Sequence, residues 1–318
     1  MGGPALPPLL DTYTGAAAAY SLRKLKSDYT GKVLQVRRAS DHVEVDVGFD
    51  SNGLLSLDSP VTNVTEESTG ITQGSSTNAA KLGEFCGEAR RGGGDTSYAT
   101  VDSMTEAAHV EVVTWYDQSG NTINVTQTAA NGQPRIYDRS SGLIVEANGK
   151  PAIKFDGSSS VLKNTNGWTQ GSSRNDFTVL SSDGTASGVW NTDFNPRFSQ
   201  NLRCDSMKFT TLGFTSSNGV VSVSEPNAST INTSYLVTAE YDLTNTALSL
   251  YKNGSLEVTT SMVNQRTGTG GDVSIGTAYH DTDGDFGGKI QEIVSYQTRK
   301  ADIRADIETN INTFYSIY

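Results

Sequence analysis

Cysteine, histidine and proline are scarce in this chain, and it has no long apolar run. Of its 318 residues, two are cysteine, three are histidine and eight are proline. Two cysteines exclude a disulfide-based scaffold, so Cys86 and Cys204 are predicted to be free thiols, although the sequence leaves a single bridge between them open. No apolar segment approaches the roughly 18 residues that a membrane span requires, and no membrane partner is expected.

Charge is also sparse, and one sign dominates. Charged residues make up 19% of the chain, and 35 acidic against 24 basic residues give a net charge of −11. Nucleic-acid binding requires Lys/Arg-rich surfaces that neutralise phosphates, so nucleic acid is not expected as a partner. The start, residues 1–10, lacks the basic residues and long apolar core of a signal peptide. The protein is therefore expected to be made in the cytoplasm.

What the chain does contain is typical of short strands joined by tight turns. There are 32 glycines, many Ser, Thr and Asn residues, and enough aromatics (13 Tyr, 10 Phe and 3 Trp) to form a core. The pair Asn253-Gly254 predicts a two-residue hairpin turn, because both positions of that turn favour positive φ. The clearest predicted strands cover residues 32–37, 43–47, 177–180, 235–241, 247–252, 255–259, 273–277 and 289–296.

Helical patterns occur only near the two ends. The alanines of residues 14–26 favour one helix, and apolar residues three and four apart predict another over residues 302–315. More than ten short strands with helices confined to the ends predict an all-β, two-sheet sandwich with short terminal helices.

The predicted domain organisation is simple. Residues 11–318 are expected to form one domain, with a loop-rich insertion at 50–105 that contains a short apolar anchor at 82–86. Residues 1–10 hold three prolines and are expected to form an extended arm. Its leucines (Leu6, Leu9 and Leu10) would give the arm an apolar edge that docks on a neighbouring subunit.

The most informative stretch is Val112-Val-Thr-Trp-Tyr-Asp-Gln-Ser-Gly120, followed by Gln127, Gln133-Pro-Arg-Ile136 and Asn148-Gly-Lys-Pro-Ala-Ile-Lys-Phe-Asp-Gly157. This order resembles the catalytic domain of the family 54 α-L-arabinofuranosidases and its non-enzymatic relatives in phage structural proteins. The resemblance covers roughly residues 11–318. It implies a concanavalin-A/laminin-G-like jelly-roll sandwich.

Trp115, Tyr116, Asp117 and Gln118 are candidate ligand-binding residues. An aromatic ring can stack on a sugar while the Asp and Gln side chains bond its hydroxyls. The alternative is that the aromatics alternate across a strand and Asp117 closes an Asx-type turn. Trp190 and Asp193 join the candidates, because their segment aligns with the cysteine pair that lines the family's sugar pocket.

The family's catalytic carboxylates have no match in this chain. The resemblance implies a nucleophilic Glu in an Asp-Leu-Glu-Asn-Gly context, whereas Glu225 lies in Ser-Glu-Pro-Asn. The expected acid aligns with Ala278, and Asp281 could replace it only after a loop shift. A retaining glycosidase needs both carboxyls, so the chain is expected to be catalytically inactive.

The acidic loop at 280–288 is a candidate calcium site. Its carboxylates Asp281, Asp283 and Asp285 alternate as they do in a calcium loop. Phe286 takes the place of the required glycine, and the segment that follows alternates like a strand and not a helix, so both features argue against an EF-hand. A calcium-binding rim and a solvated hairpin loop both remain open, and no other cofactor is expected.

These observations predict a structural protein of the phage virion, either a capsid decoration protein or a component of the tail or fibre. Its expected partners are other virion proteins and host-surface glycans, and it is expected to be a homo-oligomer or part of a symmetric assembly. The alternative is an arabinofuranosidase-like glycoside hydrolase.

Overall fold

The structure is a computed structural model. It describes residues 7–40, 42–65, 81–86, 88–90, 98–100, 109–170, 173–185, 187–194, 197–217, 219–264, 268–277 and 285–318. The helical segments are α1 (Leu9–Thr12), α2 (Leu82–Phe85), the 3-10 turn η2 (Ala130–Gly132) and α3 (Arg304–Tyr315). The strands are β1 (Ala18–Ser21), β2 (Leu34–Arg38), β3 (Glu44–Val47), β4 (Val61–Thr65), β5 (Glu88–Arg90), β6 (Tyr98–Thr100), β7 (His109–Trp115), β8 (Val125–Thr126), β9 (Arg135–Asp138), β10 (Gly142–Leu143), β11 (Ile153–Asp156), β12 (Leu162–Gln170), β13 (Arg174–Ser182), β14 (Ser187–Phe194), β15 (Arg197–Asp205), β16 (Lys208–Phe214), β17 (Val220–Ser224), β18 (Tyr235–Asp242), β19 (Ala247–Lys252), β20 (Ser255–Ser261), β21 (Gly268–Ile275) and β22 (Gly287–Tyr296).

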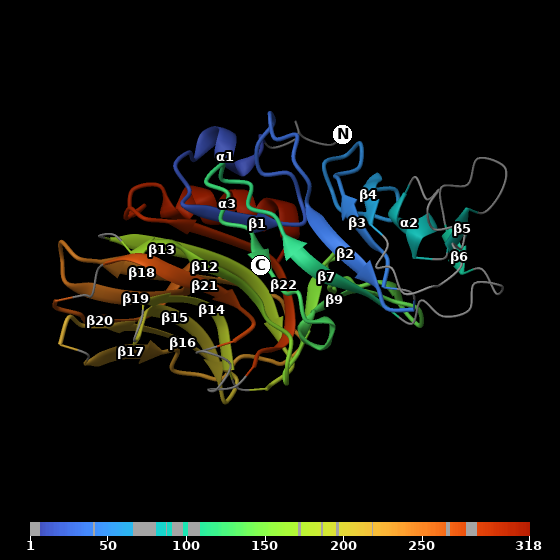
Figure 1. Cartoon of the computed structure of the whole chain (residues 1–318). Helices are drawn as coiled ribbons and strands as arrows, with labels where there is room; N and C mark the ends of the chain where they lie inside the picture. The colour runs from blue at the N-terminus through green and yellow to red at the C-terminus, as the bar shows by residue number, and fades with distance from the viewer. Residues whose placement is uncertain are drawn as a thin grey trace.

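Antiparallel strands form two layers that face each other (Figure 1). One layer has the order β20–β19–β18–β13–β22, and the far edge of β22 pairs with both β1 and β11. The other has the order β17–β16–β15–β14–β21–β12–β8. The layers are joined through β7 and β9, since β7 pairs with β8 and β9, and β9 pairs with β11. The chain is thus a nearly all-β sandwich, as predicted.

Helix α3 covers the outer face of the first layer, with α1 beside it (Figure 1). Because of this cover, every residue of β13 is buried, so that strand has apolar contacts on both faces. Phe177 and Val179 lie in the apolar cluster with α3, whereas Leu180 lies in the main core between the layers. Contacts on both faces therefore hold β13 as a fully buried strand inside this layer.

The strongest sequence patterns correspond to observed strands. The segments predicted at 235–241, 247–252 and 289–296 lie in β18, β19 and β22. The hairpin prediction is confirmed, because Asn253 and Gly254 have φ of 51° and 80° between β19 and β20. The C-terminal helix is also confirmed, as α3.

The predicted helix over residues 14–26 is wrong. Two of its alanines, Ala18 and Ala19, lie in β1, where Ala18 pairs with Ser295 and Ser21 with Glu292. Ala18 contacts the main core while Ala19 contacts the cluster beneath α3. Tertiary pairing with the edge of β22 therefore outweighs the helix propensity of alanine, which is worth less than about 1 kcal/mol per residue.

The prediction that Leu9 and Leu10 form an exposed edge of an extended arm is also wrong. Both lie in α1, are 0% and 4% exposed, and pack in one apolar cluster with Ile307 and Ile311 of α3. Residues 1–6 lie outside the described part of the chain. The division at residue 10, and the insertion at 50–105, stay predictions.

The apolar anchor predicted at residues 82–86 is confirmed as the short helix α2, whose Leu82 and Phe85 are buried in the main core. Cys86 and Cys204 are both buried, and they are not joined by a disulfide. Burial raises the pKa of the Cys204 thiol. The thiol is therefore protonated at neutral pH.

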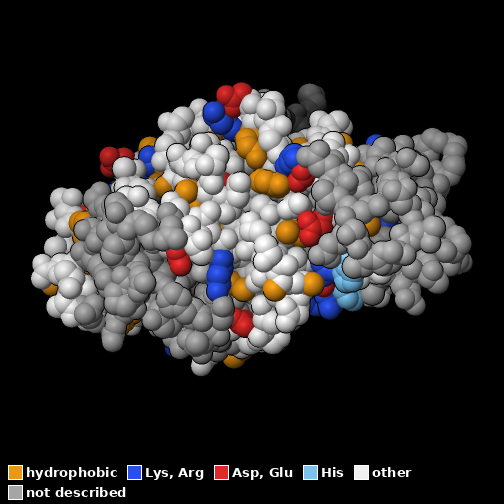
Figure 2. Space-filling model, viewed as in Figure 1, with side chains coloured by type: hydrophobic (Ala, Val, Ile, Leu, Met, Phe, Trp, Pro, Cys, Tyr) orange, Lys and Arg blue, Asp and Glu red, His pale blue; other side chains and the backbone are white. Residues whose placement is uncertain are grey.

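On the face shown in Figure 2, the charged side chains of the described residues are scattered among white neutral atoms. Within the described part of the chain, no helix is long and apolar enough to cross a membrane.

Candidate functional site

The first candidate aromatics lie at the end of β7. Trp115 is 0% exposed and packs against Tyr20, with ring centroids 5.7 Å apart. Tyr116 is half-buried, and its hydroxyl donates to Asp46 Oδ1 at 2.8 Å. Burial raises the pKa of Tyr116, and the bond to Asp46 adds to this shift. In this arrangement, Trp115 has no ring face open to a sugar.

Asp117 closes the turn after β7. Its Oδ1 accepts the Ser119 N–H at 2.9 Å and, across the sheet, the Ala19 N–H at 2.8 Å. Its Oδ2 accepts the Ser119 hydroxyl at 2.7 Å and the Ile123 N–H at 3.1 Å. The carboxylate oxygens are therefore occupied by the Asx-type turn that the sequence offers as the alternative.

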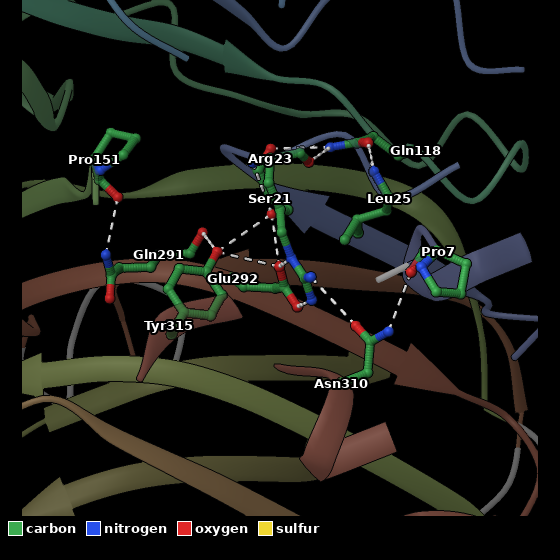
Figure 3. Close-up of polar contacts among 10 residues, drawn as sticks. All are labelled: Pro7, Ser21, Arg23, Leu25, Gln118, Pro151, Gln291, Glu292, Asn310 and Tyr315. Carbon is green, nitrogen blue, oxygen red and sulfur yellow. Dashed lines mark hydrogen bonds and ion pairs between the residues drawn. The ribbon is translucent and has the colours of Figure 1, made fainter. Parts of the chain in front are cut away.

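Gln118 joins this turn to the N-terminal segment (Figure 3). Its Oε1 accepts the Leu25 N–H at 2.8 Å, and its Nε2 donates to the carbonyls of Ser21 and Arg23 at 3.0 Å each. The side chain is 1% exposed. The amide thus satisfies backbone groups at the end of β1 and in the segment that follows it.

A buried polar network continues from that segment (Figure 3). Arg23 forms an ion pair with Glu292, whose Oε2 also accepts the Ser21 hydroxyl at 2.7 Å and the Tyr315 hydroxyl at 3.1 Å. Arg23 Nη1 donates to Asn310 Oδ1 at 3.2 Å. Burial raises the pKa of Tyr315 well above its ordinary value. The network links β1, β22 and α3.

Trp190 lies in a second buried cluster. It is 0% exposed, and its ring lies 5.9 Å from Tyr20 and 6.0 Å from Trp168. The Arg174 guanidinium lies 5.4 Å and 5.9 Å from the Trp168 and Trp190 rings, and Arg174 Nε donates to Asp176 at 2.6 Å. The cluster belongs to the core. Asp193 pairs through its backbone with Asp272 in β21, and its binding role stays a prediction.

Glu225 is a structural carboxylate. It is 1% exposed, and it forms an ion pair with Lys252. Its Oε1 accepts the Phe209 N–H and the Ser229 hydroxyl, both at 2.8 Å. With its oxygens taken up by these partners, Glu225 has the contacts of a loop anchor.

Most of the acidic loop, including Asp281 and Asp283, lies outside the described residues, as does Ala278. Asp285 forms isolated bridges with Thr277 and Gly188. Among the described residues, no three His, Cys, Asp or Glu side chains gather closely enough to hold a metal ion. The calcium prediction therefore stays a prediction.

A polar cleft lies where β7, β9 and β11 meet. Its cavity volume is about 400 Å³, and we call it the β9–β11 cleft. Its lining combines both signs of charge with amide and hydroxyl groups, and it consists of Glu111, Ala130, Asn131, Gln133, Arg135, Lys154, Phe155, Asp156, Ser160 and Asp183. Such convergent donors and acceptors suit a ligand rich in hydroxyls.

Two of the cleft's acids are held by strong partners. Glu111 forms a partly buried ion pair with Arg37, whose Nε donates to Gln133 Oε1 at 2.7 Å. Asp156 Oδ1 accepts the N–H groups of three successive serines, at 2.9–3.0 Å. Burial acts to raise the pKa of Asp156, but these hydrogen bonds outweigh it and lower the pKa. Asp156 is therefore an anionic acceptor and not an acid.

Several residues of this cleft lie in segments that the sequence analysis singled out, but none of them was named as a candidate site residue. Gln133, Arg135, Lys154 and Asp156 all come from the segments that carry the family resemblance. The candidates chosen from the same segments, Trp115 to Gln118, instead lie in the core and its turns. Alternation on β11 offered one signal, because Lys154 and Asp156 are exposed while Ile153 and Phe155 are buried.

No family model matches this sequence, and no curated protein matches it. Among solved structures, the fold is similar to an arabinofuranosidase complexed with arabinofuranosyl-α-1,2-xylobiose, with a TM-score of 0.56 and 15% identity over 96% of this chain and 64% of that chain. A GH54 α-L-arabinofuranosidase soaked with a cyclic sulfate inhibitor gives the same TM-score, identity and coverage. A ligand-binding domain of botulinum neurotoxin serotype D, in complex with N-acetylneuraminic acid, has a TM-score of only 0.46 at 14% identity and covers 64% of this chain and 48% of its own.

At this identity, the similarity to the arabinofuranosidases shows the fold alone. This chain spans 64% of the length of those proteins. The β-sandwich implied by the sequence resemblance is therefore confirmed, and the relationship to phage proteins stays a proposal.

Proposed function

We propose that this chain is a non-catalytic, carbohydrate-binding sandwich of the concanavalin-A/laminin-G type and a structural protein of a phage particle. The observation that carries the binding role is the β9–β11 cleft, a cavity of about 400 Å³ with acceptors of both acidic and amide type beside two cationic donors. Sugar hydroxyls both donate and accept hydrogen bonds, so they match such a lining.

The proposal of inactivity rests on the state of the carboxylates. Glu225, the Glu nearest the nucleophile's place in the sequence, is buried and paired with Lys252. In the cleft, the lowered pKa of Asp156 keeps it ionised, whereas a glycosidase acid needs a raised pKa. The phage assignment rests on the sequence resemblance.

A glycan array with the purified chain tests the binding role. Asp183→Asn removes an exposed cleft carboxylate and should weaken binding, whereas Asp205→Asn, a half-buried acid outside the cleft lining, should not. Absence of glycan binding, or equal loss in both variants, would contradict the assignment. Mass spectrometry of purified virions tests the phage assignment separately.

The second candidate is an arabinofuranosidase-like hydrolase, which the fold similarity over 96% of this chain favours. Incubation with an aryl α-L-arabinofuranoside separates the two functions. We expect no release of the aryl group. Release that is abolished by Glu225→Gln or Asp281→Asn, in variants that remain folded, would establish the hydrolase.

A further inference from the structure

A row of charged side chains crosses the sheet along the β9–β11 cleft. Successive strand pairings place residues of β2, β7, β9, β11 and β22 directly opposite one another, in the order Arg37, Glu111, Arg135, Lys154 and Lys289. Directly opposed residues in antiparallel pairs point to the same face, with Cβ atoms about 5 Å apart. The charges alternate at first and then end in three adjacent cations.

The first pair of the row neutralises itself. Arg37 and Glu111 form an ion pair in which both side chains are largely buried, at 8% and 12% exposure. This pair therefore adds little net charge to the row. The three cations that follow repel one another, since like charges directly opposite destabilise a sheet.

The cations at the two ends of this trio have carboxylate neighbours. Arg135 lies 3.8 Å from Asp138, and Lys289 lies 3.7 Å from the buried Glu146. Lys154, between them, is exposed, and among the residues that the structure describes it has no carboxylate within ion-pair distance. The middle of the row is thus an unmatched positive charge in the wall of the cleft, in a chain whose net charge is −11.

Acceptors lie one step further along the same wall. Asp156 is two residues after Lys154 in β11 and lies opposite Gly287 of β22. The Gly287 carbonyl in turn accepts the Asp183 N–H at 3.0 Å. A Cβ on Gly287 would lie 2.4 Å from Asp183 Oδ1, so the Asp183 carboxylate lies over this glycine toward the cleft. Donors for an anion and acceptors for hydroxyls therefore face the same cavity.

Resting on the proposed carbohydrate-binding role, we propose that the β9–β11 cleft binds acidic saccharides of the uronic-acid class. The sugar carboxylate lies against Lys154 and Arg135, and Arg135 can bind it through two parallel hydrogen bonds. The ring hydroxyls donate to Asp156 and Asp183. This orientation uses both signs of charge in the lining and relieves the repulsion within the row.

The test uses titration calorimetry with a galacturonic acid trisaccharide and its fully methyl-esterified form, which keeps the ring hydroxyls and removes the charge. We expect the acid to bind at least about tenfold more tightly than the ester, which corresponds to about 1.4 kcal/mol. Raising salt from about 50 mM to about 500 mM should weaken binding of the acid only, because salt screens exposed charges.

Variants of the row complete the test. Lys154→Gln should abolish the preference for the acid, Lys154→Arg should retain it, and Lys208→Gln, on β16 and outside the cleft lining, should leave it unchanged. Equal affinity for acid and ester would overturn the proposal and leave carbohydrate binding intact. If neither form binds, the acidic-sugar proposal is overturned and the binding function of the cleft loses its support as well.

Discussion

The Arg23 guanidinium and the Glu292 carboxylate make a two-point ion pair inside the protein, with Nε–Oε2 and Nη2–Oε1 distances of 2.7 and 2.9 Å. The side chains are 7% and 0% exposed. The pair joins the segment after β1 to the centre of β22, and Asn310 extends it to α3. It therefore links the two ends of the chain.

Removal of one partner should leave the other charge buried without compensation. We expect Glu292→Gln to lower the free energy of unfolding by about 3–5 kcal/mol. Asp28→Asn, which breaks the exposed pair with Lys26, should change it by less than about 0.5 kcal/mol. Denaturant unfolding measures both, and equal effects would contradict a structural role for the buried pair.

Gln118→Ala should destabilise the fold by at least about 2 kcal/mol, because it leaves the Leu25 N–H and the carbonyls of Ser21 and Arg23 without this partner. The exposed Asn52→Ala serves as the control. A Gln118 variant with unchanged stability and lost glycan binding would restore the ligand-binding interpretation of this residue.

The Asp156 carboxylate should make the stability of the protein depend on acid pH. Its folded pKa is lowered from the ordinary value of 3.8, so its contribution is fully present above pH 3.8 and is lost as the pH falls below that value. Asp156→Asn should remove this part of the acid sensitivity. The free energy of unfolding of the wild-type protein and of the variant, measured from pH 6 downward, should therefore converge at low pH. Two parallel curves would refute a stabilising role for the ionised Asp156 carboxylate.

Leu9→Ala should lower the free energy of unfolding by about 2–5 kcal/mol, because Leu9 fills the cluster between α1 and α3. Leu256→Ala, at a position that is 55% exposed, is the matched control. A Leu9 variant as stable as the control would mean that the N-terminal segment does not contribute to the fold in solution.

Calcium should raise the melting temperature if the acidic loop at 280–288 binds it, since a ligand of the folded state stabilises by mass action. The double variant Asp283→Asn with Asp285→Asn should lose the shift. Identical melts with calcium and with chelator, or a shift that survives the double variant, would identify the loop as a solvated hairpin.

Several features follow from the sequence alone, because their causes are local. Alternation of apolar residues marks strands such as β19, positive φ at Asn253 and Gly254 sets the hairpin, and apolar spacing marks α3. The Asx-type turn at Asp117, one of the two alternatives from the sequence, is the one that the structure forms. The pattern of short strands and the resemblance to the arabinofuranosidases both predicted the sandwich.

Tertiary structure decided the features that depend on distant partners. Ala18 and Ala19 form a strand because they pair with the edge of β22. Trp115 and Trp190 became core residues because two layers close over them, although either indole could have served as a sugar platform. The row through Arg135 and Lys154 exists only in the register of β9 and β11, and no spacing along the chain records which strands become neighbours.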